Sequence, residues 1–243
     1  MAEKRNVNEP GRLKAPNILK LVFLTLLLAT LTYIGSYVYF MTRPASNEDK
    51  LTDQLSTISI AGTKLFPALK NYSLDQIDGR EPILKGWLTK TPQLPKRLSN
   101  SIKGNYPVTF REDELNAWLS RRIKAKQGGL ANIYIKNSHI WVNLKKNDME
   151  LVIEREIPNE QSHVTILKLK FESYDRGYTI HPYSAHIGHV NAPGGFARLI
   201  TSPYKLLADE LFEDLAPYHD RQIRNITVED GRITISPRSV TSS

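Results

Sequence analysis

Residues Leu21–Met41 read LVFLTLLLATLTYIGSYVYFM, a stretch of 21 residues without a charged side chain. At a rise of about 1.5 Å per residue, it would form a helix about 30 Å long, the hydrocarbon thickness of a bilayer. Backbone amides in lipid must be satisfied within their own segment, so the stretch predicts a single transmembrane helix. It is longer than the roughly 7 to 15 apolar residues of a signal peptide and lacks an A-x-A-like site. We therefore expect an uncleaved membrane anchor.

The charges on the two sides of this stretch predict its orientation. Five basic residues precede it (Lys4, Arg5, Arg12, Lys14 and Lys20), whereas Glu48 and Asp49 soon follow it. The positive-inside rule then makes residues 1–20 a cytoplasmic tail and residues 21–41 the membrane span. The expected location is the cell inner or plasma membrane, crossed once, with the C-terminal domain periplasmic or extracellular.

Composition excludes several classes of function. The chain has no cysteine, which rules out disulfides, thiol catalysis and cysteine-ligated metals and favours a bacterial envelope protein. The net charge of +8 is divided evenly: residues 1–43 hold six basic and two acidic residues, and the other 200 hold 27 and 23. The surface of the exported part is therefore expected to carry positive and negative charges in similar numbers. We expect the membrane as a partner, but no nucleic acid.

Residues 42–104 predict a linker and an irregular helical segment. Leu51, Leu55 and Ile58 are spaced for a short helix, but prolines and glycines interrupt residues 60–107 repeatedly. Both a stalk and a loosely structured covering of the domain fit this pattern.

Residues 105–243 predict an α+β exported domain that begins with an amphipathic helix. Thr109 and Glu112 have capping-box spacing, and Leu115, Trp118 and Leu119 form an apolar stripe. Acidic residues at the start of this helix and basic residues at its end suit the helix dipole.

Period-2 segments follow and predict an antiparallel meander. We expect strands around residues 133–135, 140–144, 149–153, 165–171 and 178–190, with turns at Asn137–Ser138 and at the KKND sequence of residues 145–148. A second helix is expected over residues 195–216, divided at Pro203. Asp230–Gly231 predicts a two-residue hairpin turn near the C-terminus.

The polar clusters offer weak candidates for chemistry. His181, His186 and His189 are too far apart on an extended strand to bind one zinc ion, and we expect them at the surface or at the mouth of a groove. Ser184 lacks the G-x-S-x-G context of a nucleophile. No catalytic residue, metal ligand or cofactor is therefore expected. The turn at Gly194 and Gly195 enters a helix, whose free amides are candidates for holding a lipid headgroup.

The order of these motifs resembles the YpmS-like membrane-anchored bacterial proteins, an uncharacterised group that is similar to tubular lipid-binding (TULIP-like) domains. Glu114-Leu115-Asn116, Ile187-Gly188, Pro193 and the Val228–Ile233 hairpin hold the corresponding places, and the similarity covers roughly residues 105–236. It implies a curved antiparallel sheet packed on amphipathic helices, with an apolar groove for a ligand. The candidate groove residues are Leu167, Leu169, Phe171, Ile180, Ile187, Phe196, Leu199, Ile200 and Leu207.

The expected function is a non-catalytic envelope protein whose exported domain binds a lipid or another apolar ligand at the membrane face. Two alternatives stay open from the residues alone. One is a structural module that holds an envelope protein partner, and the other is an envelope hydrolase.

Overall fold

The computed structural model describes residues 15–45, 49–84, 93–122, 136–159, 161–174, 177–193 and 223–238. The chain divides into two compact units, Met1–Tyr39 and Phe40–Ser243.

Helix α1 (Ala15–Met41) is the element that the structure describes in the first unit. The boundary between the units falls just before its last two residues, Phe40 and Met41, which belong to the second unit. Residues Ile18–Met41 are long and apolar enough to cross a membrane, as predicted, and their position suits an anchor or a signal sequence. The hydroxyls of Thr25, Thr30 and Thr32 each donate to the carbonyl four residues earlier. These polar groups are therefore satisfied within the helix, as an apolar environment requires.

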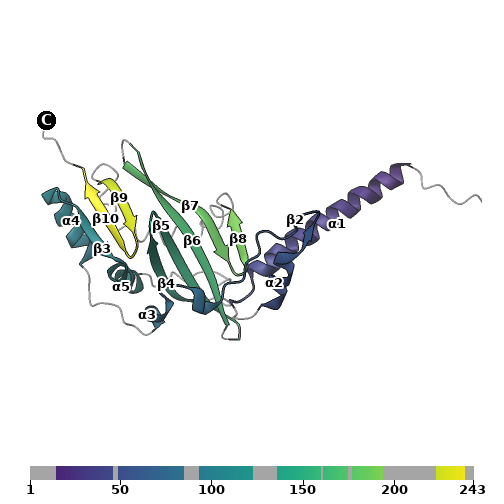
Figure 1. The fold of residues 1–243 in the computed structure, drawn as a ribbon, viewed down its shortest axis with the longest axis horizontal. Coiled ribbons are helices and arrows are strands. Elements are labelled where there is room, and N and C mark those ends of the chain that lie inside the picture. Colours follow the sequence, from purple (N-terminus) through teal and green to yellow (C-terminus); the bar gives the residue numbers. More distant parts are fainter. Residues whose placement is uncertain are drawn as a thin grey trace, which may run out of the picture. The chain divides into compact units, whose positions relative to one another are not determined.

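The second unit contains a five-stranded antiparallel sheet in chain order (Figure 1). Its strands are β4 (Lys136–Lys145), β5 (Asp148–Ile157), β6 (Gln161–Tyr174), β7 (Gly177–Ile187) and β8 (Val190–Pro193). The predicted meander is confirmed, as is the turn after Lys145. The single strand predicted over residues 178–190 is wrong, because β7 ends at Ile187 and a turn at Gly188 leads into β8. The strand predicted at residues 133–135 lies outside the described residues. The predicted turn at Asn137–Ser138 is wrong: both residues lie in β4, and a register shift between Asn137 and His139 takes up the extra residue.

One face of this sheet is apolar and packs against helix α5 (Glu112–Arg122). Successive strand residues point to opposite faces, so the alternation seen in the sequence places the aliphatic residues together. The buried cluster on this face consists of Leu119, Ile140, Val142, Leu151, Ile153, Leu167, Ala185, Ile187 and Ala192.

A second sheet has the order β3 (Val108–Arg111), β10 (Arg232–Pro237) and β9 (Ile223–Glu229). Helix α4 (Leu94–Gly104) contributes Leu94 and Leu98 to the buried cluster beside it, together with Phe110 and Ile233. The predicted hairpin is confirmed: Glu229 pairs with Arg232 across a turn in which Gly231 has a φ of +72°.

The start of α5 differs from the predicted capping box. Thr109 lies in β3, where its hydroxyl bonds that of Thr234 across the strand pair at 2.9 Å. The helix instead begins at Glu112, and Glu114 accepts a hydrogen bond from the N–H of Arg111 at 2.9 Å. The strand pairing of Thr109 has displaced the cap by two residues.

The other face of the five-stranded sheet is covered by residues 69–84 and Ala45. Trp141, Val152, Val164 and Ile166 pack there with Ala45 and Ile77 in a third buried cluster. The elements upstream of α4 are α2 (Lys50–Thr57), β1 (Ser59–Ile60), β2 (Thr63–Lys64), the 3-10 helix η1 (Leu74–Gln76) and α3 (Arg80–Leu84). The short helix predicted from Leu51, Leu55 and Ile58 is thus present as α2.

Candidate functional site

The last two residues of α1, which belong to the second unit, are hydrogen-bonded to the residues around its five-stranded sheet. The N–H of His189 donates to the carbonyl of Phe40 at 3.0 Å, and Nε2 of His163 donates to the carbonyl of Met41 at 2.7 Å. The last carbonyls of a helix have no partner within it, so β6 and the β7–β8 turn supply the missing donors. We call residues 40–44, Asp49, Thr52, His163, Gly188 and His189 the helix-end cluster.

Gly188 allows this close approach. Its φ is +55°, a conformation that side-chain-bearing residues rarely adopt. A Cβ atom at this position would lie 2.5 Å from the carbonyl oxygen of Met41 and 2.8 Å from that of Phe40. The turn therefore requires glycine both for its conformation and for its contact with α1.

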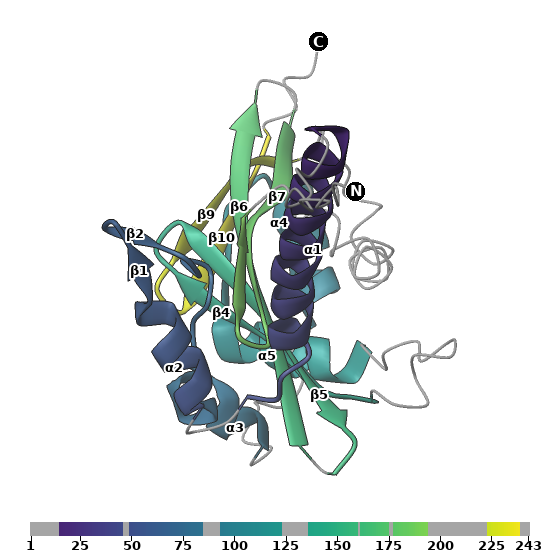
Figure 2. The ribbon, with the colours of Figure 1, turned by 90° about the vertical axis from the view of Figure 1, so that its right-hand side faces the viewer.

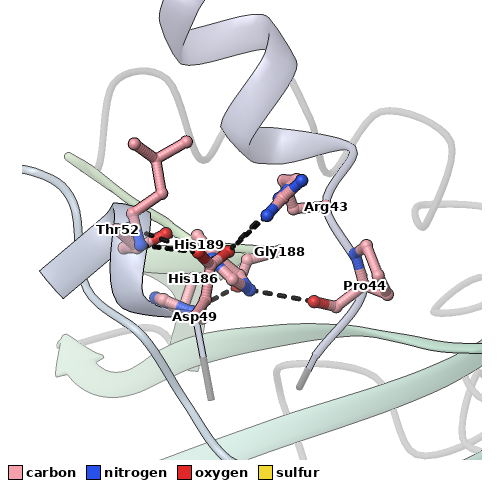
Figure 3. Close-up of polar contacts among 8 residues, drawn as sticks. Arg43, Pro44, Asp49, Thr52, His186, Gly188 and His189 are labelled. Atoms are coloured by element: carbon pink, nitrogen blue, oxygen red, sulfur yellow. Dashed lines mark hydrogen bonds and ion pairs between the residues drawn. The ribbon is translucent and has the colours of Figure 1, made fainter. Parts of the chain in front are cut away.

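Asp49 joins α2 to the residues that follow α1. Its carboxylate accepts the N–H groups of Leu51 and Thr52 as the N-cap of α2 and forms an ion pair with Arg43 at 3.1 Å (Figure 3). Burial alone would raise the pKa of Asp49, but the N–H of Thr52 and the guanidinium of Arg43 hold it below its ordinary value.

His189 lies at the centre of the cluster and is fully buried. Its Nε2 donates to the carbonyl of Pro44 at 2.9 Å, while Nδ1 lies 2.7 Å from the hydroxyl of Thr52 and 3.0 Å from the carboxylate of Asp49 (Figure 3). Burial lowers the pKa of His189, and the Pro44 carbonyl and Asp49 partly oppose this effect.

His186 connects the cluster to a neighbouring cavity. Its Nε2 donates to the carbonyl of Gly188 at 2.7 Å, and its ring meets the ring of Tyr72 edge-on at 4.3 Å between centroids. Burial lowers the pKa of His186 to about 4, so the ring is neutral at pH 7. Both His186 and His189 are buried, so a surface position is wrong for them, whereas His186 does lie in the wall of the cavity.

The cavity has a volume of about 340 Å³ and lies between the second face of the sheet and residues 70–78. Its walls are largely polar and charged: Lys70, Tyr72, Gln76, Ile77, Asp78, Asn143, Lys145, Glu150, Ile166, Lys168, Tyr183, Ser184, His186 and Asn191. Lys145 forms ion pairs with Asp78 at 3.1 Å and Glu150 at 3.2 Å, and Lys168 pairs with Glu150 at 3.2 Å. Three lysines against two carboxylates leave the cavity with an excess of positive charge.

The ammonium of Lys70 lies at one side of this cavity. It donates to the hydroxyl of Tyr72 at 3.1 Å and lies 4.5 Å from the centre of that ring. Neither contact neutralises its charge, so Lys70 is the cavity lysine best placed to bind an anionic group.

The serine in the cavity has no geometry for nucleophilic catalysis. The hydroxyl of Ser184 donates to Oδ1 of Asn191 at 3.2 Å, whereas Nε2 of His186 is engaged by the Gly188 carbonyl. In the part of the chain that the structure describes, no three His, Asp or Glu residues converge as a metal site would require.

Four of the predicted groove residues (Leu167, Leu169, Phe171 and Ile187) belong to the apolar clusters on the opposite face of the sheet from this cavity. Leu167 and Ile187 are in the apolar cluster with α5, and Leu169 and Phe171 are partly buried at the edges of the apolar clusters. Ile180 pairs with Phe171 in the β6–β7 ladder. Phe196, Leu199, Ile200 and Leu207 and the headgroup candidates Gly194 and Gly195 lie outside the described residues.

Sequence reasoning missed His163, Asp49 and the cavity lysines. A local signal exists for Asp49, because an aspartate directly before the Leu51–Leu55–Ile58 pattern is a typical N-cap. Lys168 alternates with Leu167 and Leu169, which predicts that it lies on the polar face of a strand. No pattern in the neighbouring sequence indicates that residues 70–78 cover that face. The contact between His163 and Met41 spans 122 positions and leaves no mark in either segment.

No protein-family model matches the chain, and a search of curated proteins finds no match. The resemblance to YpmS-like and TULIP-like proteins stays a prediction.

Proposed function

We propose that this chain is a non-catalytic, single-pass membrane protein whose exported domain binds the headgroup of an anionic lipid at the membrane face. In this proposal residues 1–20 are cytoplasmic, α1 crosses the inner or plasma membrane, and the second unit is periplasmic or extracellular. The observation that carries it is the position of the lysine-containing cavity directly beside the helix-end cluster.

Two backbone hydrogen bonds connect the cavity to that cluster. The N–H of Lys70 donates to the carbonyl of His189 at 3.0 Å, and the N–H of Asn191 donates to the carbonyl of Ala68 at 2.7 Å. His189 in turn donates to Phe40, the second-last residue of α1. If α1 spans the bilayer, the cavity is held close to the lipid headgroups by a short chain of bonded residues.

The size and charge of the cavity favour a headgroup over a whole lipid. A volume of about 340 Å³ is at the lower end of the range for small-molecule sites, roughly 300 to 1,000 Å³. Polar walls would leave an acyl chain in contact with charged groups, so the chains would stay in the bilayer while the phosphate reaches Lys70. The engagement of Ser184 by Asn191 supports a binding role without hydrolysis.

The test is native mass spectrometry of the full-length protein titrated with phosphatidylglycerol. Lys70→Glu places a carboxylate at the proposed phosphate position and should weaken binding about tenfold or more, since hydrogen bonds between charged groups contribute about 1.5 to 3 kcal/mol. Lys103→Glu makes the same charge change on the exposed end of α4 and should bind like the wild type. Equal binding by the two variants would contradict the proposal.

A second candidate site is the apolar face of the sheet, where the resemblance to TULIP-like domains implies a groove for an apolar ligand. It is favoured by Leu169 and Phe171, which are only partly buried at the edges of the apolar clusters. A bound lipid that is lost in Leu169→Trp and kept in Lys70→Glu would identify this groove as the site.

A further inference from the structure

Exposed apolar side chains outside α1 are concentrated in one short segment. Among the described residues, five large hydrophobic side chains of the second unit are exposed: Leu51, Ile58, Ile60, Leu65 and Tyr106. Four of them lie within residues 51–65. Ile60 is 64 % exposed, although it is an aliphatic residue in a strand. Exposed apolar side chains that are clustered, unlike ones scattered singly, are typical of interaction sites.

Three of these side chains share one face of the β1–β2 hairpin. Ser59 pairs with Lys64 and Ile60 with Thr63, and the N–H of Leu65 donates to the carbonyl of Ile58 at 3.0 Å. Residues two apart on a strand point to the same side, and so do directly paired residues. Ile58, Ile60 and Leu65 therefore lie on one face, and Ser59 and Lys64 on the other.

The apolar face continues along α2. Leu51, Leu55 and Ile58 are spaced at i, i+4 and i+7 and form one side of that helix. In Figure 2 the hairpin projects from the end of α2, away from the five-stranded sheet. We call Leu51, Ile58, Ile60 and Leu65 the hairpin patch.

The hairpin patch is tied to the point where the chain leaves α1. Only eight residues separate Met41 from Lys50, the first residue of α2. Arg43 binds Asp49, the N-cap of α2, through Nε at 3.2 Å and Nη2 at 3.1 Å. This ion pair holds the start of α2 to a residue that closely follows α1, so only a short segment separates the patch from the end of the membrane span.

We propose that the hairpin patch is a second membrane contact, in which Ile58, Ile60 and Leu65 enter the headgroup and upper acyl region of the bilayer that holds α1. The inference rests on the membrane anchor of the proposed function and does not depend on the cavity. Lys50 and Lys64 are exposed on the same segment and suit anionic lipid, whose surface attracts basic residues near it. The segment resembles an interfacial anchor in having an apolar side and a charged side.

The absence of cysteine makes a labelling test direct, because each introduced cysteine is the only reactive thiol. Full-length variants Leu28→Cys, Ile60→Cys and Tyr106→Cys are labelled with an environment-sensitive fluorophore and placed in vesicles of phosphatidylglycerol and phosphatidylcholine. Leu28 reports on α1, and Tyr106 is a matched control, since it is 48 % exposed but lies beyond α4. We expect labels at positions 28 and 60 to shift to the blue and to be quenched by nitroxide-bearing lipid. The label at 106 should behave as in water.

Each other outcome overturns the inference in its own way. A quenched label at 28 with a water-like label at 60 leaves the anchor intact and removes the second contact. A blue-shifted label at 60 without lipid quenching means that a protein, either a partner or a second copy, covers the patch. Quenching at 60 and 106 alike means unspecific adsorption. A water-like label at 28 removes the anchor itself and the inference with it.

A charged variant tests the contribution of the neighbouring side chains. Ile58→Asp combined with Leu65→Asp places two carboxylates beside position 60. If the patch enters lipid, the label at 60 should lose its blue shift and its quenching in this background. Unchanged quenching would overturn the assignment of these residues. The label at 28 should be unaffected, which controls for insertion of the whole protein.

Discussion

Gly188 packs directly against the last two carbonyl groups of α1, so a substitution there should disturb this contact. Gly188→Ala forces an alanine into a left-handed conformation and places a Cβ atom 2.5 Å from a backbone oxygen. Gly231→Ala is the matched control, because Gly231 has a φ of +72° but nothing within 4 Å of an added Cβ. We expect the control to lose about 1 to 2 kcal/mol of unfolding free energy. Gly188→Ala should lose roughly 1 to 3 kcal/mol more, the usual cost of overpacking.

Denaturant unfolding of the two full-length variants in the same detergent measures this difference. Equal losses would mean that the backbone at Gly188 moves away from Met41 without cost, and the helix-end contact would then be loose.

At this scale the sequence predicts little of the site. Gly188 was visible only as an interruption of a strand, and the chemistry of His189 depends on Pro44, Asp49 and Thr52, which are far from it in sequence. A pattern along one strand contains no information about which distant carbonyl the turn will meet. Asp49 is the exception, since its capping role depends on the next three residues alone.

At the scale of elements, α5 protects the free edge of β4. β4 is the first strand of the sheet, so one side of its backbone has no strand partner. Asn116 supplies both missing bonds at Val142, donating to its carbonyl at 2.9 Å and accepting its N–H at 2.7 Å. Glu112 accepts the N–H of Leu144 at 2.6 Å. Side chains thus occupy an edge that could otherwise pair with another chain.

Asn116→Ala tests how much the side chain of Asn116 stabilises the edge of β4. It leaves a buried N–H and a buried carbonyl without partners, and each such group costs about 1 to 3 kcal/mol. We expect a loss of roughly 2 to 6 kcal/mol of unfolding free energy. The amide of Val142 should also exchange faster with deuterium. Thr109→Ala removes an exposed hydroxyl from the β3–β10 pair and should leave exchange at Val142 unchanged. If both variants exchange alike, the edge is protected by other contacts.

The sequence predicts the helices and strands better than it predicts the site. Alternation over residues 140–171 identified the strands and their order, because period 2 and short turns leave few other topologies. The failure at Asn137–Ser138 has a tertiary cause. Asn and Ser favour turns locally, but Asn137 pairs with Arg155 and His139 with Glu154, so the strand continues through both positions.

At the scale of the whole second unit, buried neutral histidines should make stability depend on pH. His163 and His186 are at most 6 % exposed, and burial lowers the pKa of both, that of His186 to about 4. Their pKa in the unfolded chain is about 6.5. The unfolded chain therefore binds more protons below that pH, and stability must fall as the pH falls. The contribution is fully present above about pH 6.5.

The measurement is the unfolding free energy of the full-length protein between pH 7.5 and 5. This window lies above the ordinary pKa of Asp49 and Glu154, 3.8 and 4.5, and the pKa of each is lowered further, so both carboxylates stay ionised across it. Burial raises the pKa of Glu112, so the contribution of His186 is isolated by comparison with a variant. For His186 alone, a pKa difference of 6.5 against about 4 corresponds to at most about 3 kcal/mol, about half of it reached by pH 5. His186→Gln keeps a donor for the Gly188 carbonyl but cannot titrate, so its profile should be flatter. Identical slopes for the wild type and this variant would mean that His186 has the same pKa in the folded and the unfolded chain, so that burial does not shift it.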